Sequence, residues 1–192
     1  MCIRDSQKTG IVPNKKWKKD KIGESWYAGE TLISAIGQGF VLTNPFQLAV
    51  MTSIIASNGK MIVPTIIKGQ SVSFKSNEKY SKEIKIIKNA MFKVVNENKG
   101  TAFKSRLENI KFAGKTGTSQ VKRISLSERE SDDFREKEQE WKNRDHALFV
   151  GYMPYDDPKY SISVIIEHGG SGASTAAPIA KQIFNYINEL EA

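Results

Sequence analysis

The pattern of apolar and polar residues predicts two helices in the middle of the chain and one at its end. Apolar residues recur at helical spacing from about Ser81 to Asn98, before Gly100, and again in the closing segment APIAKQIFNYINELEA. The segment NPFQLAVMTSIIASNG, starting at Asn44, has almost no polar face. It predicts a buried helix with an asparagine cap at its start and Asn58-Gly59 at its end.

Alternating segments in the second half predict three antiparallel strands. One lies in NIKFAGKTGTSQV, and two lie in HALFVGYMPYDDPKYSISVIIEHGG, where the turn-rich stretch Pro154 to Lys159 joins them as a hairpin. Helices in the middle, a late antiparallel sheet and a terminal helix packed on it make an α+β domain.

The remaining segments are polar and predict loops. Residues Gly10 to Glu30 are expected to form a covering loop anchored by Trp17, Trp26 and Tyr27. QSVSFKSNEKYS is expected to be a polar connection and GGSGAS a flexible loop. Residues 122–145 form a charged insertion between strands, either a solvated loop or a short exposed helix.

Composition limits the possible functions. A chain of 192 residues with 39% hydrophobic content can bury a core, so residues 10–192 are expected to form one domain or a large part of one, after a ragged or non-native start at residues 1–9. The net charge of +8 is spread along the chain without a dense basic stripe, so we expect no nucleic-acid partner. One cysteine and two histidines predict no metal site and no cofactor.

The stretch AGKTGTSQV, residues 113–121, carries the candidate chemistry. A strand with this sequence presents the cation of Lys115, the hydroxyls of Thr116 and Thr118, and at Gly117 a backbone that a ligand can approach closely. This combination suits a carboxylate, and the Thr118 N–H could face a reacting carbonyl.

Two other interpretations apply to this stretch. For an arbitrary tetrapeptide of this kind, a bend in a strand is the favoured one. A phosphate-binding loop matches at Gly114-Lys115-Thr116, but Asn109 occupies the position of its first glycine and no helix start follows. The phosphate-loop interpretation is therefore set aside.

AGKTGTSQV resembles the Lys-Thr-Gly motif of penicillin-binding proteins, which serine β-lactamases share. WYAGETLISAIGQGFVLTNPFQLAVMTSIIASNG and DHALFVGYMPYDDPKYSISVIIEHGGSGASTAAPIAKQI resemble the segments before and after that motif in class B transpeptidases of cell elongation. The resemblance runs from about Gly10 to the C-terminus and implies the C-terminal portion of the penicillin-binding transpeptidase fold, an antiparallel sheet flanked by helices.

The resemblance also implies an activity and its residues. The family cross-links peptidoglycan stem peptides ending in D-Ala-D-Ala through an acyl-serine, and β-lactam antibiotics acylate the same serine. By this resemblance the active-site residues are Lys115, Thr116, Gly117 and Thr118; Lys115, Thr116 and Thr118 bind the substrate carboxylate, and the Thr118 amide is half of the oxyanion hole. Membrane-bound elongation proteins are the implied partners, on the periplasmic face of the inner membrane, with the anchor upstream.

The serine motif itself is not where the family has it. Ser76-Asn77-Glu78-Lys79 and Ser131-Asp132-Asp133 match Ser-x-x-Lys and Ser-x-Asp by letter, but neither has the right context, and both are rejected. The chain alone is therefore expected to be inactive. A non-catalytic carboxylate-binding module and a serine β-lactamase or D,D-carboxypeptidase relative remain the alternatives.

Overall fold

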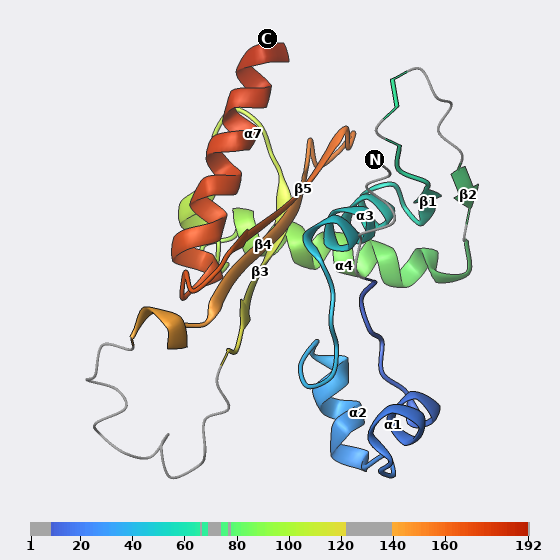
Figure 1. Ribbon diagram of the computed structural model, residues 1–192. Coiled ribbons are helices and arrows are strands. Elements are labelled where there is room, and N and C mark those ends of the chain that lie inside the picture. The colour runs from blue at the N-terminus through green and yellow to red at the C-terminus, as the bar shows by residue number, and fades with distance from the viewer. Residues whose placement is uncertain (1–8, 66, 69–73, 77, 122–139, 192) are drawn as a thin grey trace. The chain divides into compact units, whose positions relative to one another are not determined.

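The computed structural model describes residues 9–65, 67–68, 74–76, 78–121 and 140–191 (Figure 1). They fall into two compact units, Met1–Leu48 and Ala49–Ala192. The helices are α1 Lys15–Ile22, α2 Ala28–Ala35, α3 Pro45–Ala56, α4 Ser81–Asn96 and α7 Ala177–Glu191. The strands are β1 Lys60–Ile62, β2 Phe74–Ser76, β3 Ala113–Ser119, β4 His146–Met153 and β5 Tyr160–Ile166. None of the helices described here is both long and apolar enough to cross a bilayer.

The first unit contains helices where a covering loop was predicted, so that prediction is wrong. The Asn14 side chain accepts a hydrogen bond from the Trp17 N–H at 2.9 Å and starts α1, and Gly23 ends it with a φ of 82°. Helix α1 has the sequence KKWKKDKI, whose many lysines hide any apolar periodicity. Its caps, rather than an apolar stripe, mark it in the sequence.

Lys18 on α1 links the two short helices of this unit. Its side chain is buried, and Nζ donates a hydrogen bond to Glu30 Oε1 at 2.6 Å and lies 3.3 Å from Glu24 Oε2. Nζ also lies 4.4 Å from the centre of the Tyr27 ring. Burial alone would lower the pKa of Lys18, but the hydrogen bonds to Glu30 and Glu24 raise it above the ordinary lysine value. The ammonium therefore stays charged in its buried position.

Acidification is expected to loosen α1 and α2. The hydrogen bonds from Lys18 and from the Tyr27 N–H hold the pKa of Glu30 below its ordinary value, so the folded unit binds this proton less tightly than the unfolded chain. The stabilisation is complete above the ordinary glutamate pKa of about 4.3 and is lost as the pH falls through the lower folded value. Amide hydrogen exchange in α1 and α2, corrected for intrinsic rates, should show less protection near pH 3 than at neutral pH.

The Glu30→Gln variant is the control for this prediction. It should show weaker protection than the wild type at neutral pH and a much smaller change on acidification, because the titrating carboxylate is gone. Equal acid sensitivity in wild type and variant would assign the effect to another group.

Helix α3 begins and ends as predicted but is not buried. The Gln47 N–H donates to Asn44 Oδ1 at 2.8 Å, and Asn58 and Gly59 take left-handed conformations after its last turn. Its buried residues are only Thr52 and Ala56, while Phe46 and Met51 are 49% and 44% exposed. In the part of the chain that the structure describes, only one side of the helix is covered, so an all-apolar sequence overstated its burial.

The sheet of the second unit confirms the three predicted strands and the α+β prediction. Its order is β3-β4-β5, with both pairs antiparallel. Lys115 pairs with Val150 and Thr116 with Phe149, and Phe149 in turn pairs with Val164. Helix α7 lies along one side of the sheet in Figure 1, as predicted for the closing amphipathic helix.

Two apolar clusters cover the two faces of this sheet, because alternate residues of β4 point to opposite sides. Phe149 and Met153 belong to the cluster with α7, in which the Phe112 ring lies 5.1 Å from that of Phe184. Tyr152 belongs to the other cluster, together with Ala56, Met91 and Ala113. Helix α4 contributes to both clusters, through Val95 to the first and Met91 to the second. It therefore contacts β3 and links the two clusters.

Two further segments differ from their predictions. Within the predicted polar connection, Phe74–Ser76 forms β2 and pairs with β1. The predicted flexible loop, residues 169–174, overlaps a π-helical turn at Gly172–Ala176, which is capped by the Ser171 side chain and leads into α7. The conformation of such short segments depends on the elements that they pack against, and a local sequence pattern does not reveal these contacts. Most of the charged insertion and the predicted ragged start, at residues 122–139 and 1–8, lie outside the described residues.

Candidate active site

The Lys-Thr-Gly-Thr stretch occupies the middle of β3. This strand pairs with β4 on one side and has no strand on its other side among the described residues. An edge strand presents unpaired backbone N–H and C=O groups along its open side. The stretch is therefore an extended, accessible strand, and the alternative of a simple bend is excluded.

The pleat of β3 divides the four residues between its two faces. Thr116 and Thr118 project on one face, while Lys115 and Gly117 belong to the other. The motif predicts that the side chains of Lys115, Thr116 and Thr118 bind one carboxylate together. The strand geometry allows this only at the open edge, where a long side chain from one face can bend toward the hydroxyls of the other.

Lys115 bends in this way. Its exposed side chain turns along the strand, and Nζ donates a hydrogen bond to the Thr116 carbonyl oxygen at 2.6 Å. The Thr116 hydroxyl lies 2.9 Å from the Thr101 hydroxyl, and Thr118 is exposed at the following position of the same face. A cation and two hydroxyls thus lie close together on an open strand edge, an arrangement able to receive an anion with two or more oxygens.

The glycines of this stretch make room for neighbouring parts of the fold. A Cβ at Gly114 would lie 2.2 Å from Phe149 Cζ, so this glycine leaves space for a core ring. Gly117 faces the π-helical turn, because a Cβ on Gly172 would lie 2.3 Å from the Gly117 carbonyl oxygen. The sequence predicts that a ligand approaches the backbone closely at Gly117. In the structure, Gly172 packs against the Gly117 backbone, so a ligand cannot approach Gly117 from that side.

Sequence reasoning missed two residues that contact the site. Thr101 follows α4 and reaches Thr116, and Gly172 packs on the backbone of β3 and β4. Both are distant from Lys115 in the chain, so no motif spacing connects them with it. Two features of the sequence could have drawn attention to them. Thr101 follows Gly100 at the end of a predicted helix, and Gly172 belongs to the glycine-rich run before the last helix.

The two histidines, His146 and His168, contact each other. The His168 N–H donates to His146 Nδ1 at 2.9 Å, and the Trp141 ring lies 4.4 Å from the His168 ring. These contacts join the end of β5 to the start of β4. The described residues contain no group of three His, Cys, Asp or Glu side chains that could hold a metal ion.

The rejected serine motifs gain no support. Ser76 lies in β2, whose partner is β1, and not at the start of an apolar core helix. Ser131 to Asp133 lie outside the described residues.

Comparison with known proteins identifies the family. Residues 4–185 match the model of the penicillin binding protein transpeptidase domain. The chain belongs to this transpeptidase family. The match covers nearly the whole sequence and confirms the resemblance found in the motifs.

Curated relatives within the transpeptidase family are named peptidoglycan D,D-transpeptidases. The chain is 34% identical over 189 residues to the peptidoglycan D,D-transpeptidase MrdA of Haemophilus influenzae, covering 91% of this chain and 28% of that protein. It is 26% identical over 193 residues to MrdA of Escherichia coli, covering 94% of this chain and 30% of that protein. The chain therefore spans less than a third of the length of these relatives.

Solved structures of the transpeptidase family agree with the fold. The structure of penicillin-binding protein PBP2 in complex with MreC from Helicobacter pylori matches with a TM-score of 0.78 and 34% identity, over 94% of this chain and 31% of that one. PBP2 of Pseudomonas aeruginosa in complex with WCK 5153 matches with a TM-score of 0.68 and 30% identity, over 92% and 36% of the two chains. The fold prediction is thereby confirmed, and both structures show the similarity of this chain to penicillin-binding protein 2.

Proposed function

We propose that this chain is the C-terminal portion of the transpeptidase domain of a peptidoglycan D,D-transpeptidase of the elongation type. Family membership and the similarity to MrdA and PBP2 support the enzyme class. The observation that carries the site is the Lys115–Thr118 stretch on the open edge of β3. In this proposal residues 10–192 belong to the domain, and residues 122–145 are an insertion between β3 and β4.

The proposed ligand of the edge is the terminal carboxylate of a stem peptide ending in D-Ala-D-Ala. The Lys115 ammonium leaves the Thr116 carbonyl and pairs with the carboxylate, while the hydroxyls of Thr116 and Thr118 donate to its oxygens. The β-lactam carboxylate occupies the same place. Binding of the terminal residue holds the penultimate carbonyl in position for attack.

The acyl transfer is a two-step exchange. A serine oxygen attacks the carbonyl of the penultimate D-alanine, the peptide bond to the terminal D-alanine breaks, and the departing amine takes up a proton. The amine of a second stem peptide then displaces the serine, which regains its proton. The backbone N–H of Thr118 stabilises the negative charge on the carbonyl oxygen in both steps.

The serine of this reaction is proposed to lie outside the 192 residues. The chain has letter matches to Ser-x-x-Lys at Ser57, Ser76 and Ser119 and to Ser-x-Asp at Ser131. Among the described residues none of them opens an apolar helix, so in this proposal the chain supplies the carboxylate-binding strand alone. We propose that the complete protein is anchored at the periplasmic face of the inner membrane by an N-terminal segment. By analogy with the Helicobacter pylori complex of PBP2 with MreC, it would join membrane-bound elongation proteins.

Intact-protein mass spectrometry after incubation with penicillin tests this function. We expect one stoichiometric adduct on the full-length protein, mapped to a serine at the start of an apolar helix, and none on the 192-residue chain. An adduct on the short chain would contradict the absence of the nucleophile. No adduct on the full-length protein, with D-alanyl peptides still bound, would favour a non-catalytic binding module.

The β-lactamase or carboxypeptidase alternative gives a different result in the same experiment. A β-lactamase would release the hydrolysed drug and return to the unmodified mass within the incubation, whereas a transpeptidase remains acylated. Released terminal D-alanine without cross-linked product would indicate a carboxypeptidase.

A further inference from the structure

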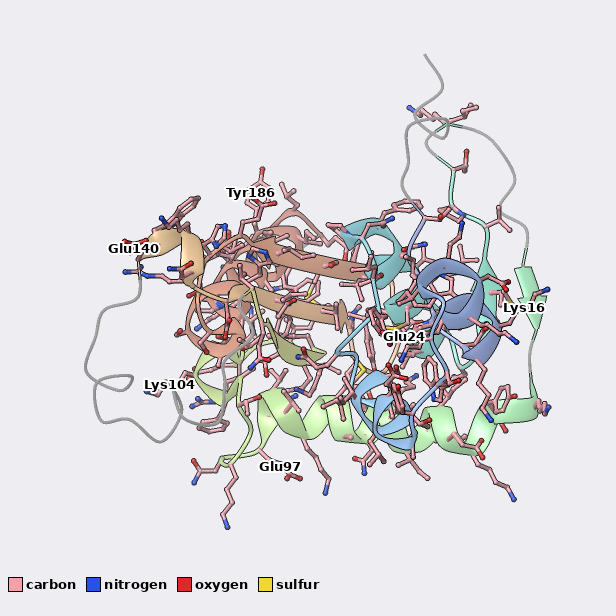
Figure 2. All side chains as sticks on the ribbon, turned by 60° about the horizontal axis from the view of Figure 1, so that its bottom comes forward. Lys16, Glu24, Glu97, Lys104, Glu140 and Tyr186 are labelled. Atoms are coloured by element: carbon pink, nitrogen blue, oxygen red, sulfur yellow. The ribbon has the colours of Figure 1, made fainter. Side chains whose placement is uncertain are left out.

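Thr101 is the one described side chain outside β3 that is hydrogen-bonded to a hydroxyl of the candidate site. Its Oγ1 lies 2.9 Å from Thr116 Oγ1, and either oxygen can be the donor. Thr101 lies just after α4, fifteen positions before Thr116 in the chain. Figure 2 shows Glu97 and Lys104, which flank this turn, at the same end of α4.

The backbone on both sides of Thr101 is fixed. The Gly100 N–H donates to the Glu97 carbonyl at 2.8 Å, and the Ala102 N–H donates to the Val94 carbonyl at 3.0 Å. A Cβ at Gly100 would lie 2.2 Å from the Val94 carbonyl oxygen, so only glycine lets the chain turn this closely against the helix. Ala102 is fully buried in the cluster with α7.

This anchoring gives the Thr101 hydroxyl a defined place at the surface. Its side chain is exposed, and its β-branch restricts rotation about χ1. The hydroxyl would be well solvated without Thr116, so the Thr–Thr hydrogen bond adds little to the stability of the fold.

The direction of the Thr101–Thr116 hydrogen bond determines whether the Thr116 hydroxyl can donate to an anion. Each threonine hydroxyl has one proton and can accept further hydrogen bonds. If Thr116 donates to Thr101, it has no proton left for a carboxylate. If Thr101 donates to Thr116, the Thr116 proton is free, and its donation is strengthened because its oxygen accepts a hydrogen bond at the same time.

We propose that Thr101 is a positioning residue that donates to the Thr116 hydroxyl and so directs the Thr116 proton to the substrate carboxylate. This inference rests on the proposed function. Thr101 does not contact the carboxylate in this arrangement. It acts through Thr116, whose backbone carbonyl also accepts from Lys115.

The test compares Thr101→Val, which keeps the shape and removes the hydroxyl, with Thr101→Ser, which keeps the hydroxyl. The second-order rate of acylation of the full-length protein is measured with benzylpenicillin and with its methyl ester. For the acid, Thr101→Val should lower the rate by several-fold and at most about tenfold, because the Thr116 proton is no longer directed to the carboxylate and a whole hydrogen bond to a charged group sets the upper limit. Thr101→Ser should remain within about twofold of the wild type, since the hydroxyl is retained.

The ester and a double variant separate positioning from a structural effect. The ester has no carboxylate to receive the Thr116 proton, so Thr101→Val should leave its rate nearly unchanged. In a Thr116→Val background, Thr101→Val should cause no further loss, because the two residues act in series. Equal losses for acid and ester, or equal losses for the valine and serine variants, would overturn the proposal.

The outcomes also distinguish this inference from the proposed function. A wild-type protein that penicillin does not acylate overturns the proposed function, and the role of Thr101 with it. A wild-type protein that is acylated normally, with a Thr101→Val variant that reacts equally fast, overturns the role of Thr101 alone.

Discussion

Replacing Lys115 with alanine is expected to lower the rate of penicillin acylation of the full-length protein by about 100-fold or more, as removal of one preorganised donor does in other acyl-transfer sites. The exposed ammonium lies beside the Thr116 carbonyl and can exchange this partner for a carboxylate. The variant should fold normally, because the side chain is outside the core. Stopped-flow measurement of acylation at several drug concentrations separates a loss of binding from a loss of reactivity.

Lys111→Ala is the matched control. Lys111 is exposed, four positions earlier in the chain, and its described hydrogen bond is made by its backbone carbonyl, which accepts from the Tyr155 N–H. This variant removes the same charge close to the same strand and should react within about twofold of the wild type, as expected for a screened surface charge. If both variants lose activity equally, net charge rather than the Lys115 position attracts the drug. If neither does, Lys115 is not the carboxylate anchor.

Arginine is expected to be a poor substitute at position 115. Its guanidinium keeps the charge but is planar and larger than an ammonium, so it does not reproduce a point contact beside the Thr116 carbonyl. Lys115→Arg should recover only part of the rate lost in Lys115→Ala.

The part of the site that is contiguous in the chain could be predicted from the sequence. The stretch from Lys115 to Thr118 lies in one strand, and strand alternation together with glycine spacing marked it as extended. The pairing of β4 with β5 could also be predicted, because the two strands are neighbours in the chain and are joined by a short turn. What the sequence did not reveal is which edge of β3 is open, and so that Lys115 can bend along this edge toward the threonine hydroxyls of the other face.

The contacts between distant segments could not be predicted. Thr101 reaches Thr116 only because α4 ends beside β3 and Gly100 lets the chain turn there. The polar helix α1 was missed for a different reason. Its lysine-rich sequence has no apolar stripe, and its stability comes from caps and from the buried Lys18 paired with Glu30. Pattern-based prediction detects burial along one element, whereas these features depend on pairs of elements.

Gly172→Ala is expected to destabilise the second unit strongly and to slow acylation. The added Cβ would lie 2.3 Å from the carbonyl oxygens of both Gly117 and Leu148, and 2.9 Å from the Gly117 nitrogen. These atoms belong to paired strands and cannot move without breaking the pairing, so the π-helical turn must withdraw from the sheet or β3 must shift. Overpacking of this kind lowers the free energy of unfolding by about 3 kcal/mol.

The effect of Gly172→Ala on activity follows from where the clash falls. Gly117 directly precedes Thr118, whose N–H is the proposed oxyanion donor, and such donors act only when they are held in place. A displacement of β3 at Gly117 should therefore slow acylation by benzylpenicillin and by its methyl ester alike. This differs from Thr101→Val, which is expected to spare the ester.

Gly170→Ala separates steric from conformational causes in the same segment. Gly170 has a φ of 78°. Apart from its chain neighbours, no described atom lies within 4 Å of the point that an added Cβ would occupy, so alanine there meets open space but a strained backbone. Its cost should be about 1 kcal/mol, the penalty of a left-handed alanine. Urea denaturation measures the free energy of unfolding of both variants, and the two values can be compared directly if the m-values are equal. If Gly172→Ala costs no more than Gly170→Ala, the turn adapts to the methyl group, and close packing of Gly172 on Gly117 is not what holds β3 in position.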